Sequence, residues 1–417
     1  MFLPLCIQAQ TIRKISISGI VNAGSPIDAA DCFLKNNQHL GTLTDSLGYF
    51  HFKFPQTFLY DTLIISALGF EQQEVALSSI DLSQDTVYFY LEQQSIVLNE
   101  VLIESEGYNL KKLVLRAVAN IPRNYPNERH QMKGLYRKVS TAGAGYTHLQ
   151  EAAITVEDHG YKMSTSLTNI QTEFFRETND WGDVDSLHVA VSRKISERIS
   201  QHLNTVVNPL MRLYESNFIR HYNKEDTWFD LKSMKKYIHD YYTFELMDVS
   251  VLSGDTIYQI ALATTVTPPP PKHVSGRSYL EINLSDFAIV EMQFTLGVPF
   301  QSIMSLKQVK FQKQHGRYYP SYIRSMTGRN INRNFEDDEY DIHTFWFDDV
   351  RVGKFKKIKS AEADDPYDAR SHKRNTESLH FWDSTALIKR YPLEEGIRRD
   401  LEKYQPLDEQ FRENSRD

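Results

Sequence analysis

The chain has 417 residues, enough for two or three domains, and 41% of them are hydrophobic, enough to fill a core. The net charge of −7 excludes a strong basic field, so nucleic acid is not an expected partner. The 23 Tyr and 23 Phe residues favour sheet. Two cysteines, Cys6 and Cys32, are too few for a disulfide framework or a cysteine-rich zinc site. Cys32 lies in an apolar run, so we expect it to be buried.

Residues 1–10 are apolar and include the small residue Ala9 near their end. We interpret them as the remnant of a signal peptide that is cleaved after Ala9; the frayed N-terminus of a cytosolic protein is the alternative. A lipoprotein signal at Cys6 is disfavoured because Leu5 is too large for the position before the cysteine. No later stretch is apolar over the length of a membrane-spanning helix. We therefore expect an exported protein, periplasmic or associated with the outer membrane, without a transmembrane helix in its mature chain.

Residues 12–103 contain short apolar or alternating runs separated by turn signals. The runs are 15–20, 31–34, 41–44, 49–54, 63–67, 75–77 and 86–91. We expect a tight turn at 45–48, in which Gly48 adopts a positive φ. Short strands at even spacing predict a seven-stranded type of β-sandwich.

This region also resembles a known family. The residues that carry the resemblance are 18–21, 26–30, 41–50, 63–70 and 98–103. They are similar to the carboxypeptidase-regulatory-like domain, a transthyretin-like β-sandwich common in envelope proteins of Bacteroidetes-type bacteria and in the N-terminal extensions of their TonB-dependent transporters. The resemblance implies an accessory domain without catalytic activity of its own. Cys32 stands where the family more often has Val.

Residues 108–126 change to a helical period. Apolar residues recur at steps of three and four between Leu110 and Ile121, which predicts a helix with one apolar stripe. We expect this helix to end at Ile121 because Pro122 follows. The segment 117–126, with 134–137 and 150–152, resembles an uncharacterised region found after the same sandwich in Bacteroidetes envelope proteins.

The pattern from 108 to 353 predicts a β-rich α+β domain, so the fold class is mainly β with some α. Expected strands are 135–139, 146–156, 174–176, 258–262, 279–283, 288–294, 306–311 and 318–325, with hairpin turns at 284–286 and 314–317. A helix is expected over 195–214, interrupted by Pro209. These strands predict one large antiparallel sheet or half-barrel. By analogy with periplasmic lipoprotein carriers, its concave face is a candidate site for a lipid or a partner's strand.

Residues 354–417 form the last predicted region, a charged linker followed by a helix. Residues 354–374 are charged and poor in apolar side chains, so we expect a loop or a disordered segment. A helix is predicted over 392–404, with Pro392 in its first turn and acidic residues near its N-terminus.

One catalytic motif merits a test. His148 and Glu151 have the His-x-x-Glu spacing of zinc carboxypeptidases, and His273 is a candidate for the distant ligand. However, the tetrad lies in an alternating stretch, where positions i and i+3 face opposite sides of a sheet. We therefore assign no metal site to these residues.

Other candidates have simpler structural explanations. The acidic run 336–341 is a candidate for calcium but is better explained as a solvated turn. Trp181 with Asp183 and Asp185 suggests sugar binding, but a packed Trp is the simpler interpretation. The prolines at 268–271 are expected to stiffen a loop. We expect His343 and the bulky residues after it, 344–347, to belong to a core strand.

The leader, the sandwich resemblance and the lack of a coherent catalytic set favour a non-catalytic envelope binding or scaffold protein. The sandwich would dock to an envelope protein, and the 108–353 domain would bind a partner or a hydrophobic ligand. Two alternatives stay open: a zinc metallopeptidase-like hydrolase around His148 and Glu151, and a carrier of lipid or another hydrophobic ligand in the half-barrel. No catalytic, cofactor-binding or metal-binding residue is assigned, and no cofactor is expected.

Overall fold

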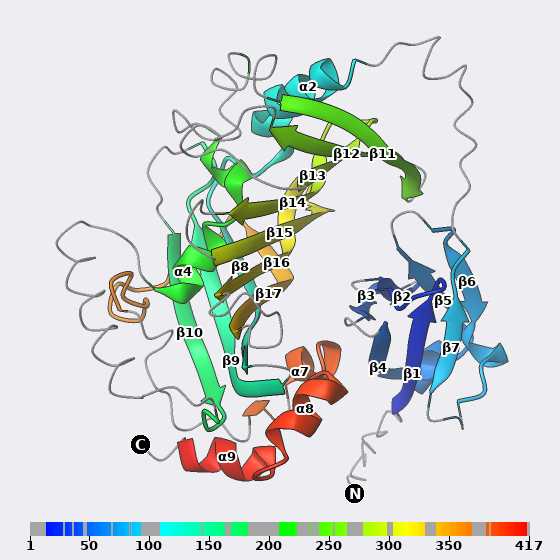
Figure 1. Cartoon of the computed structure of the whole chain (residues 1–417), viewed down its shortest axis with the longest axis vertical. Coiled ribbons are helices and arrows are strands. Elements are labelled where there is room, and N and C mark those ends of the chain that lie inside the picture. Colours follow the sequence, from blue (N-terminus) through cyan, green and yellow to red (C-terminus); the bar gives the residue numbers. More distant parts are fainter. Residues whose placement is uncertain are drawn as a thin grey trace, which may run out of the picture. The chain divides into compact units, whose positions relative to one another are not determined.

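A computed structural model describes residues 14–27, 30–35, 37–44, 48–67, 70–82, 84, 86–92, 109–142, 145–162, 168–181, 208–222, 235, 242–252, 255–264, 278–297, 303–329, 339–368, 381–382 and 385–414. The chain forms two units (Figure 1). The first consists of Met1–Ile96 and Thr385–Glu394, the second of Val97–Ser384 and Glu395–Asp417. The fold is mainly β with some α, as predicted. The predicted signal-peptide remnant and the expected domain boundary at 103–108 lie outside the described residues.

The first unit contains a two-sheet sandwich. Its described strands are β1 (Lys14–Asn22), β2 (Asp31–Leu34), β3 (Asn37–Leu43), β4 (Tyr49–Pro55), β5 (Thr62–Ser66), β6 (Gln73–Ala76) and β7 (Val87–Tyr90). The strand orders are β4-β1-β7 and β3-β2-β5-β6, and only the β1–β7 pair is parallel among these strands. Two 3₁₀ turns, η1 (Gln56–Phe58) and η2 (Leu77–Ser79), follow β4 and β6. The predicted sandwich is confirmed.

Alternation along these strands builds the sandwich core. Ile17 and Phe50 from one sheet and Leu34 and Ile65 from the other are all buried together, because each strand turns every second side chain inward. Cys32 is also fully buried, as expected. Gly48 has φ +71°, and a Cβ there would lie 2.3 Å from the Val21 carbonyl oxygen, so this turn requires glycine. Both expectations for these residues are confirmed.

The second unit contains a ten-stranded antiparallel sheet. Its strands are β8 (His130–Ala142), β9 (Gly145–Asp158), β10 (Thr168–Glu177), β11 (Tyr242–Leu252), β12 (Asp255–Thr264), β13 (Ser278–Asn283), β14 (Ile289–Gly297), β15 (Ile303–Gln314), β16 (Arg317–Arg329) and β17 (Glu339–Val352). The order is β10-β9-β8-β17-β16-β15-β14-β13-β12-β11. Each predicted strand of this region overlaps one of these, and both predicted hairpin turns are present.

The two faces of this sheet differ. We call inner the face that carries Tyr136, Ile154, Met292 and Phe345, because these side chains belong to one buried apolar core. The opposite, outer face carries Arg137, Glu151, Glu281 and Trp346, which follow from the alternation of side chains along the same strands. Two helices, α2 (Leu110–Asn124) and α4 (Pro209–Tyr214), contribute buried side chains to the inner-face core, and β11 and β12 bend past α2 (Figure 1).

One proline expectation needs correction, and another agrees with the structure. Helix α2 runs through Pro122 to Asn124 instead of ending at Ile121. Pro122 has no N–H to donate to the carbonyl four residues earlier, so the helix loses one bond there. The last turn is still closed by the Tyr125 amide, which donates to the Ile121 carbonyl oxygen at 3.1 Å. The helical pattern does not continue through Pro209, as expected: Asn208 is a non-helical N-cap, and α4 begins at Pro209, where the missing N–H costs nothing. The rest of the predicted helix, 195–207, lies outside the described residues.

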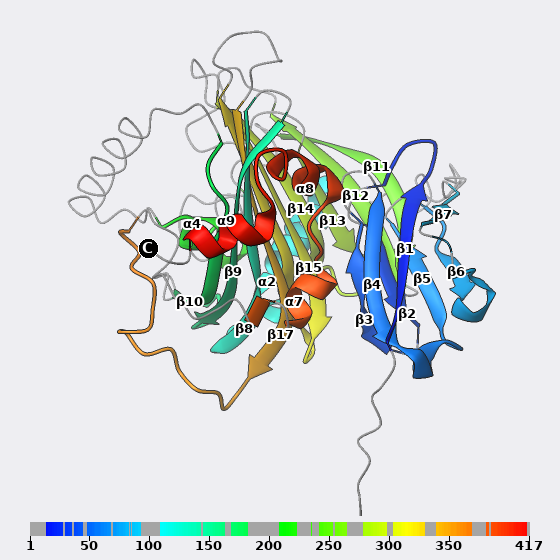
Figure 2. The ribbon, with the colours of Figure 1, turned by 90° about the horizontal axis from the view of Figure 1, so that it is seen from below.

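The C-terminal region also differs from prediction. Residues 354–368 form a loop, as expected, but disorder is the wrong description of them: the Ile358 amide donates to Glu157 Oε2 at 2.9 Å. Instead of one helix over 392–404, there are α7 (Ala386–Arg390), α8 (Glu395–Leu401) and α9 (Leu407–Asn414). In the second unit, α8 and α9 lie at the opposite end from α2 (Figures 1 and 2). None of the helices in the described ranges has the length and apolarity needed to cross a membrane.

Candidate functional site

Helix α2 packs on part of the inner face of the large sheet. Leu113, Val114, Val118 and Ile121 of this helix are buried in the same core as strands β12, β14 and β17. The stripe predicted from the sequence therefore packs on the sheet. Two polar features accompany this apolar contact. One is a cluster inside the core, and the other is a group of contacts at the end of α2.

The polar cluster inside the core is built around an ion pair. Arg220, in the 3₁₀ helix η3 (Phe218–His221), donates from Nε to Asp158 Oδ2 at 2.6 Å and from Nη2 to Asp158 Oδ1 at 3.0 Å. Tyr214 donates its hydroxyl to Asp158 Oδ2 at 2.8 Å. Burial alone would raise the pKa of Asp158, but the Arg220 guanidinium outweighs burial and lowers it. The aspartate is thus a charged group held by its partner within the apolar interior.

His130, Tyr161 and Asn217 complete this interior polar cluster. His130 is paired with Asp158 across strands β8 and β9, so both side chains lie on the inner face. Its Nδ1 lies 3.0 Å from the Glu128 carbonyl oxygen, and burial lowers the pKa of the imidazole. Asn217 donates from Nδ2 to the Tyr161 hydroxyl at 2.8 Å. The six side chains come from two strands, two loops and two short helices.

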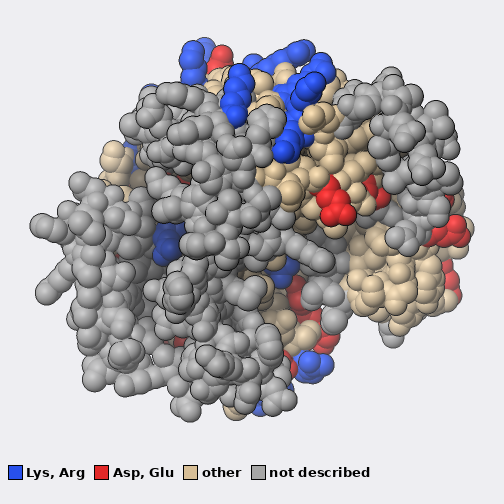
Figure 3. Space-filling view, turned by 45° about the horizontal axis from the view of Figure 1, so that its top comes forward, with Lys and Arg blue, Asp and Glu red and all other residues tan. Residues whose placement is uncertain are grey.

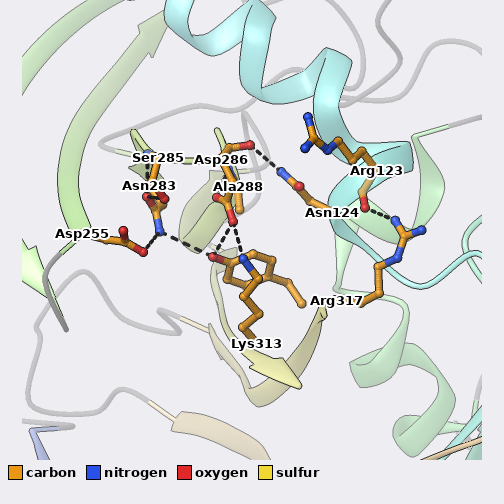
Figure 4. A network of polar contacts seen from close by, with 10 residues as sticks. Arg123, Asn124, Asp255, Asn283, Ser285, Asp286, Ala288, Lys313 and Arg317 are labelled. Carbon is orange, nitrogen blue, oxygen red and sulfur yellow. Dashed lines mark hydrogen bonds and ion pairs between the residues drawn. The ribbon is translucent and has the colours of Figure 1, made fainter. Parts of the chain in front are cut away.

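A second group of polar contacts fastens the C-terminal end of α2 to two hairpin turns of the sheet (Figure 4). Arg317 donates from Nη1 to the carbonyl oxygens of Pro122, at 3.2 Å, and Arg123. Asn124 donates from Nδ2 to the Asp286 carbonyl oxygen at 2.9 Å. The Arg317 contacts satisfy backbone carbonyls that the helix end leaves open, and the Asn124 contact ties the helix end to the β13–β14 turn. Together, these contacts fasten the helix end to the sheet. We call them the latch.

The β13–β14 turn that receives Asn124 is shaped by its own side chains. Asn283 Oδ1 accepts from the Ser285 amide at 2.8 Å, and Asp286 Oδ1 accepts from the Ala288 amide at 3.1 Å (Figure 4). Asp286 Oδ2 also accepts from Lys313 of the neighbouring turn at 2.8 Å. The two hairpin turns thus form one polar platform under the end of α2.

The solvent side of α2 is basic. Lys112, Arg116 and Arg123 are exposed, and Lys111 is half-buried. The Arg116 guanidinium lies 3.7 Å from the centre of the Phe287 ring in the β13–β14 turn. Figure 3 shows Lys and Arg side chains gathered at the end of the molecule where Figure 1 places α2. The helix therefore presents an apolar face to the sheet and a positive face to solvent.

The zinc hypothesis gains no geometric support from its two described residues. Glu151 is fully buried on the outer face, where it accepts from Arg137 Nε at 2.8 Å and from Arg176 Nε at 2.7 Å. His148 lies on the other face of β9, with its Nε2 3.8 Å from Glu177 Oε2. His273 lies outside the described residues. Within the described ranges, no group of three His, Cys, Asp or Glu side chains is placed to hold a metal ion.

The remaining sequence candidates have separate positions. Trp181 stacks on Tyr404, with 4.8 Å between ring centres, and donates to Gln410 at 3.3 Å. Asp183, Asp185 and the proline run lie outside the described residues. Glu339–Asp341 begins strand β17, so the solvated-turn interpretation is wrong for these three residues. Phe345 and Phe347 are buried in the inner-face core, as expected for a core strand.

Sequence reasoning missed an acidic pair on the outer face. Glu281 of β13 and Glu291 of β14 stand directly opposite each other, and both are buried. Tyr279 and Gln308 donate to Glu291 Oε1 at 2.7 and 2.6 Å, and Lys310 Nζ lies 3.4 Å from Glu291 Oε2. Burial and the neighbouring Glu291 raise the pKa of Glu281. The local signal was that Tyr279 and Glu281 alternate with the apolar residues Leu280 and Ile282 along β13.

Comparison with known proteins gives its most direct support to the sandwich predicted in the first unit. Residues 17–103 match the family model described as the CarboxypepD_reg-like domain, which confirms the resemblance seen in the sequence. This match covers about a fifth of the chain, so it describes the sandwich alone. No curated protein matches the sequence of the chain.

Solved structures show only weak similarity. A LolA superfamily protein from Nitrosomonas europaea has 10% identity and a TM-score of 0.22, with coverage of 59% of this chain and 94% of that one. A DUF1329 family protein from Desulfovibrio piger has 8% identity and a TM-score of 0.25, with coverage of 58% and 92%. TM-scores this low establish no common fold, so no function is transferred from these proteins.

Proposed function

We propose that the chain is a non-catalytic, exported binding protein that holds an apolar ligand between the inner face of its large sheet and helix α2. The observation that carries the proposal is the contrast between the two ways in which α2 is attached. Its apolar stripe packs on part of the inner face, whereas its C-terminal end is fastened by the polar latch. A cover of this construction can be lifted from the sheet without unfolding the strands beneath it.

The free energy needed to lift α2 from the sheet makes this movement depend on an apolar ligand. Each fully buried Leu, Val or Ile side chain of α2 contributes about 1.5–3 kcal/mol to packing. Each latch hydrogen bond contributes about 0.5–1.5 kcal/mol net, because water replaces it when it breaks. Lifting α2 therefore costs mainly apolar burial. A ligand that covers the exposed inner face offsets this cost, and a polar solute does not.

The binding experiment uses N-phenyl-1-naphthylamine, which fluoresces on entering an apolar site. We expect the full chain to bind this probe and Arg317→Ala to bind it about fivefold more tightly, because the loss of about 1 kcal/mol of latch energy raises the open population by that factor. The matched control is Arg351→Ala, which removes an exposed arginine paired with Asp349 at 2.7 Å and should bind like the wild type. Failure of the wild type and of Arg317→Ala to bind the probe would exclude the carrier function.

Docking to an envelope protein is the second candidate function, and an observation in the sandwich favours it. Tyr88 and Tyr90 of the edge strand β7 are 56% and 66% exposed, with Phe89 buried between them. Two neighbouring exposed aromatic side chains on an edge strand are typical of a protein contact. Together with the family match, they support the sandwich as the docking module.

The docking candidate is tested by fractionation of cells that express the protein. The double variant Tyr88→Ser, Tyr90→Ser should lose its association with the outer-membrane fraction while keeping the circular dichroism spectrum of the wild type. Tyr60→Ser is the control, since Tyr60 is 87% exposed in the same unit but lies away from strand β7 in the sequence. Equal retention of all three proteins would contradict docking through β7.

A further inference from the structure

Two buried polar atoms in the interior polar cluster have no hydrogen-bond partner among the described residues. They are His130 Nε2 and Asn217 Oδ1, and both side chains are completely shielded from solvent. Buried polar groups are nearly always paired, so two such atoms in one cluster require an explanation. Both belong to residues next to Tyr161: Asn217 donates to its hydroxyl at 2.8 Å, and the His130 ring centre lies 6.3 Å from its ring centre.

The chemistry of the two atoms is the same. The His130 Nδ1 faces the Glu128 carbonyl oxygen at 3.0 Å, and a carbonyl can only accept, so Nδ1 carries the proton. In the neutral ring, Nε2 is then an acceptor. The Asn217 amide nitrogen is used by Tyr161, which leaves Oδ1 as an acceptor too. The pair therefore requires hydrogen-bond donors and repels further lone pairs.

The charge around these acceptors is balanced. Asp158 and Arg220 neutralise each other through two hydrogen bonds, so the cluster offers no net charge to an ion. The rest of the surroundings is apolar core. A neutral group that carries O–H donors on an apolar body fits both the polar atoms and their environment.

We propose that His130 and Asn217 bind the neutral, hydroxyl-bearing head of the apolar ligand. This inference rests on the proposed function and specifies its ligand class. A vicinal diol supplies one O–H donor to each acceptor. An ester head has no donor, and a carboxylate adds lone pairs where donors are needed.

The experiment measures displacement of N-phenyl-1-naphthylamine by three amphiphiles with equal chain lengths: 1,2-dodecanediol, methyl dodecanoate and dodecanoate. The wild type should bind the diol about tenfold more tightly than the ester and the carboxylate. His130→Phe keeps an aromatic ring at this position, where the ring centres of His130 and Tyr319 are 5.1 Å apart, but it removes the acceptor. This variant should reduce the preference for the diol to less than twofold. His343→Phe is the control, because it also removes an inner-face histidine, half-buried in this case, whose Nδ1 is bonded to Tyr136 at 2.8 Å. It should keep the preference.

The outcomes separate the two proposals. Equal affinity of the wild type for all three amphiphiles would overturn the head-group site, leave the carrier function intact and assign the two acceptors to trapped water. A preference that survives in His130→Phe would also overturn it. Absence of probe binding would overturn the carrier function and the head-group site with it. The wild-type comparison alone decides the matter if His130→Phe does not fold.

Discussion

Arg220 and Asp158 form a two-bonded ion pair between η3 and the end of β9, 62 positions apart in the chain. Neither side chain is more than 2% exposed. A pair this deeply buried ties the segment after α4 to the sheet, because separating the two charges would leave each of them without water.

Asp158→Asn should therefore be strongly destabilising. The amide keeps the shape of the carboxylate but leaves the buried Arg220 charge uncompensated, so we expect the free energy of unfolding to fall by about 3–5 kcal/mol. Urea denaturation measures the change. Asp349→Asn is the control, because its partner Arg351 is exposed, and it should cost less than about 1 kcal/mol. Equal effects of the two substitutions would contradict a role for burial.

Glu151 should contribute to stability in a pH-dependent way. Burial raises its pKa, but Arg176 and Arg137 together lower it below the ordinary 4.5. The folded state then binds fewer protons than the unfolded state near that pH. The stabilisation is present above pH 4.5 and is lost as the pH falls through the folded pKa. Glu151→Gln should be less stable at pH 7 and should show a flatter acid limb in urea titrations.

The control for Glu151 is a surface carboxylate. Glu74 pairs with Lys35 at 2.7 Å in an exposed position. Glu74→Gln should keep both the neutral stability and the acid limb of the wild type. An unchanged acid limb in Glu151→Gln would show that other carboxylates dominate acid unfolding.

The charge of Lys307 should lower the free energy of unfolding, in contrast to the charge of Glu151. Lys307 lies on the inner face, where burial lowers its pKa from 10.5 to about 8, and its Nζ lies 3.1 Å from Ser216 Oγ. The unfolded state binds the proton more tightly, so the charge destabilises the folded state below pH 8, and this cost fades as the pH rises to 10.5. Lys307→Met should raise the unfolding free energy by about 1–3 kcal/mol at pH 7 and by less at pH 10. Lys313→Met, at the surface, should show no such gain.

Gly134 should tolerate no side chain. A Cβ at this position in β8 would lie 2.0 Å from the Trp346 carbonyl oxygen of β17, a backbone atom that cannot rotate away. Gly134→Ala should lower the unfolding free energy by at least about 2 kcal/mol in thermal or urea unfolding. Gly145→Ala is the control, since its nearest neighbour would be Asp400 Oδ2 at 3.9 Å. Similar midpoints for the two variants would mean that β8 and β17 separate easily.

Local patterns in the sequence predicted the local structure well. Gly48 is needed for its positive φ, and the hairpin turn at 284–286 follows from side chains that bond to their own backbone, so a few neighbouring residues determine both. The alternation in β12 and β13 likewise marks which side chains enter the core. The fold class and the sandwich could be predicted because they are repetitions of such short signals.

The polar contacts of the candidate site could not be predicted, because their partners are distant in the chain. Nothing near Asp158 indicates Arg220. The sequence places the end of α2 too early. Arg317, 194 positions after Arg123, satisfies the carbonyls of Pro122 and Arg123, and nothing near the helix indicates this contact. Helix α9 had a weak signal, since Leu407 and Phe411 lie four residues apart and both are buried.

The strand order of the large sheet has a consequence for biosynthesis. Strand β8 receives its second neighbour only from β17, and Tyr136 bonds to His343 across 207 positions. During synthesis, β8 therefore has one unpaired edge until β17, Glu339–Val352, has been made. Pairing over such a separation is slow, and an open edge invites other chains. The edge of β8 is thus the part of the large sheet most open to wrong pairing until β17 is made.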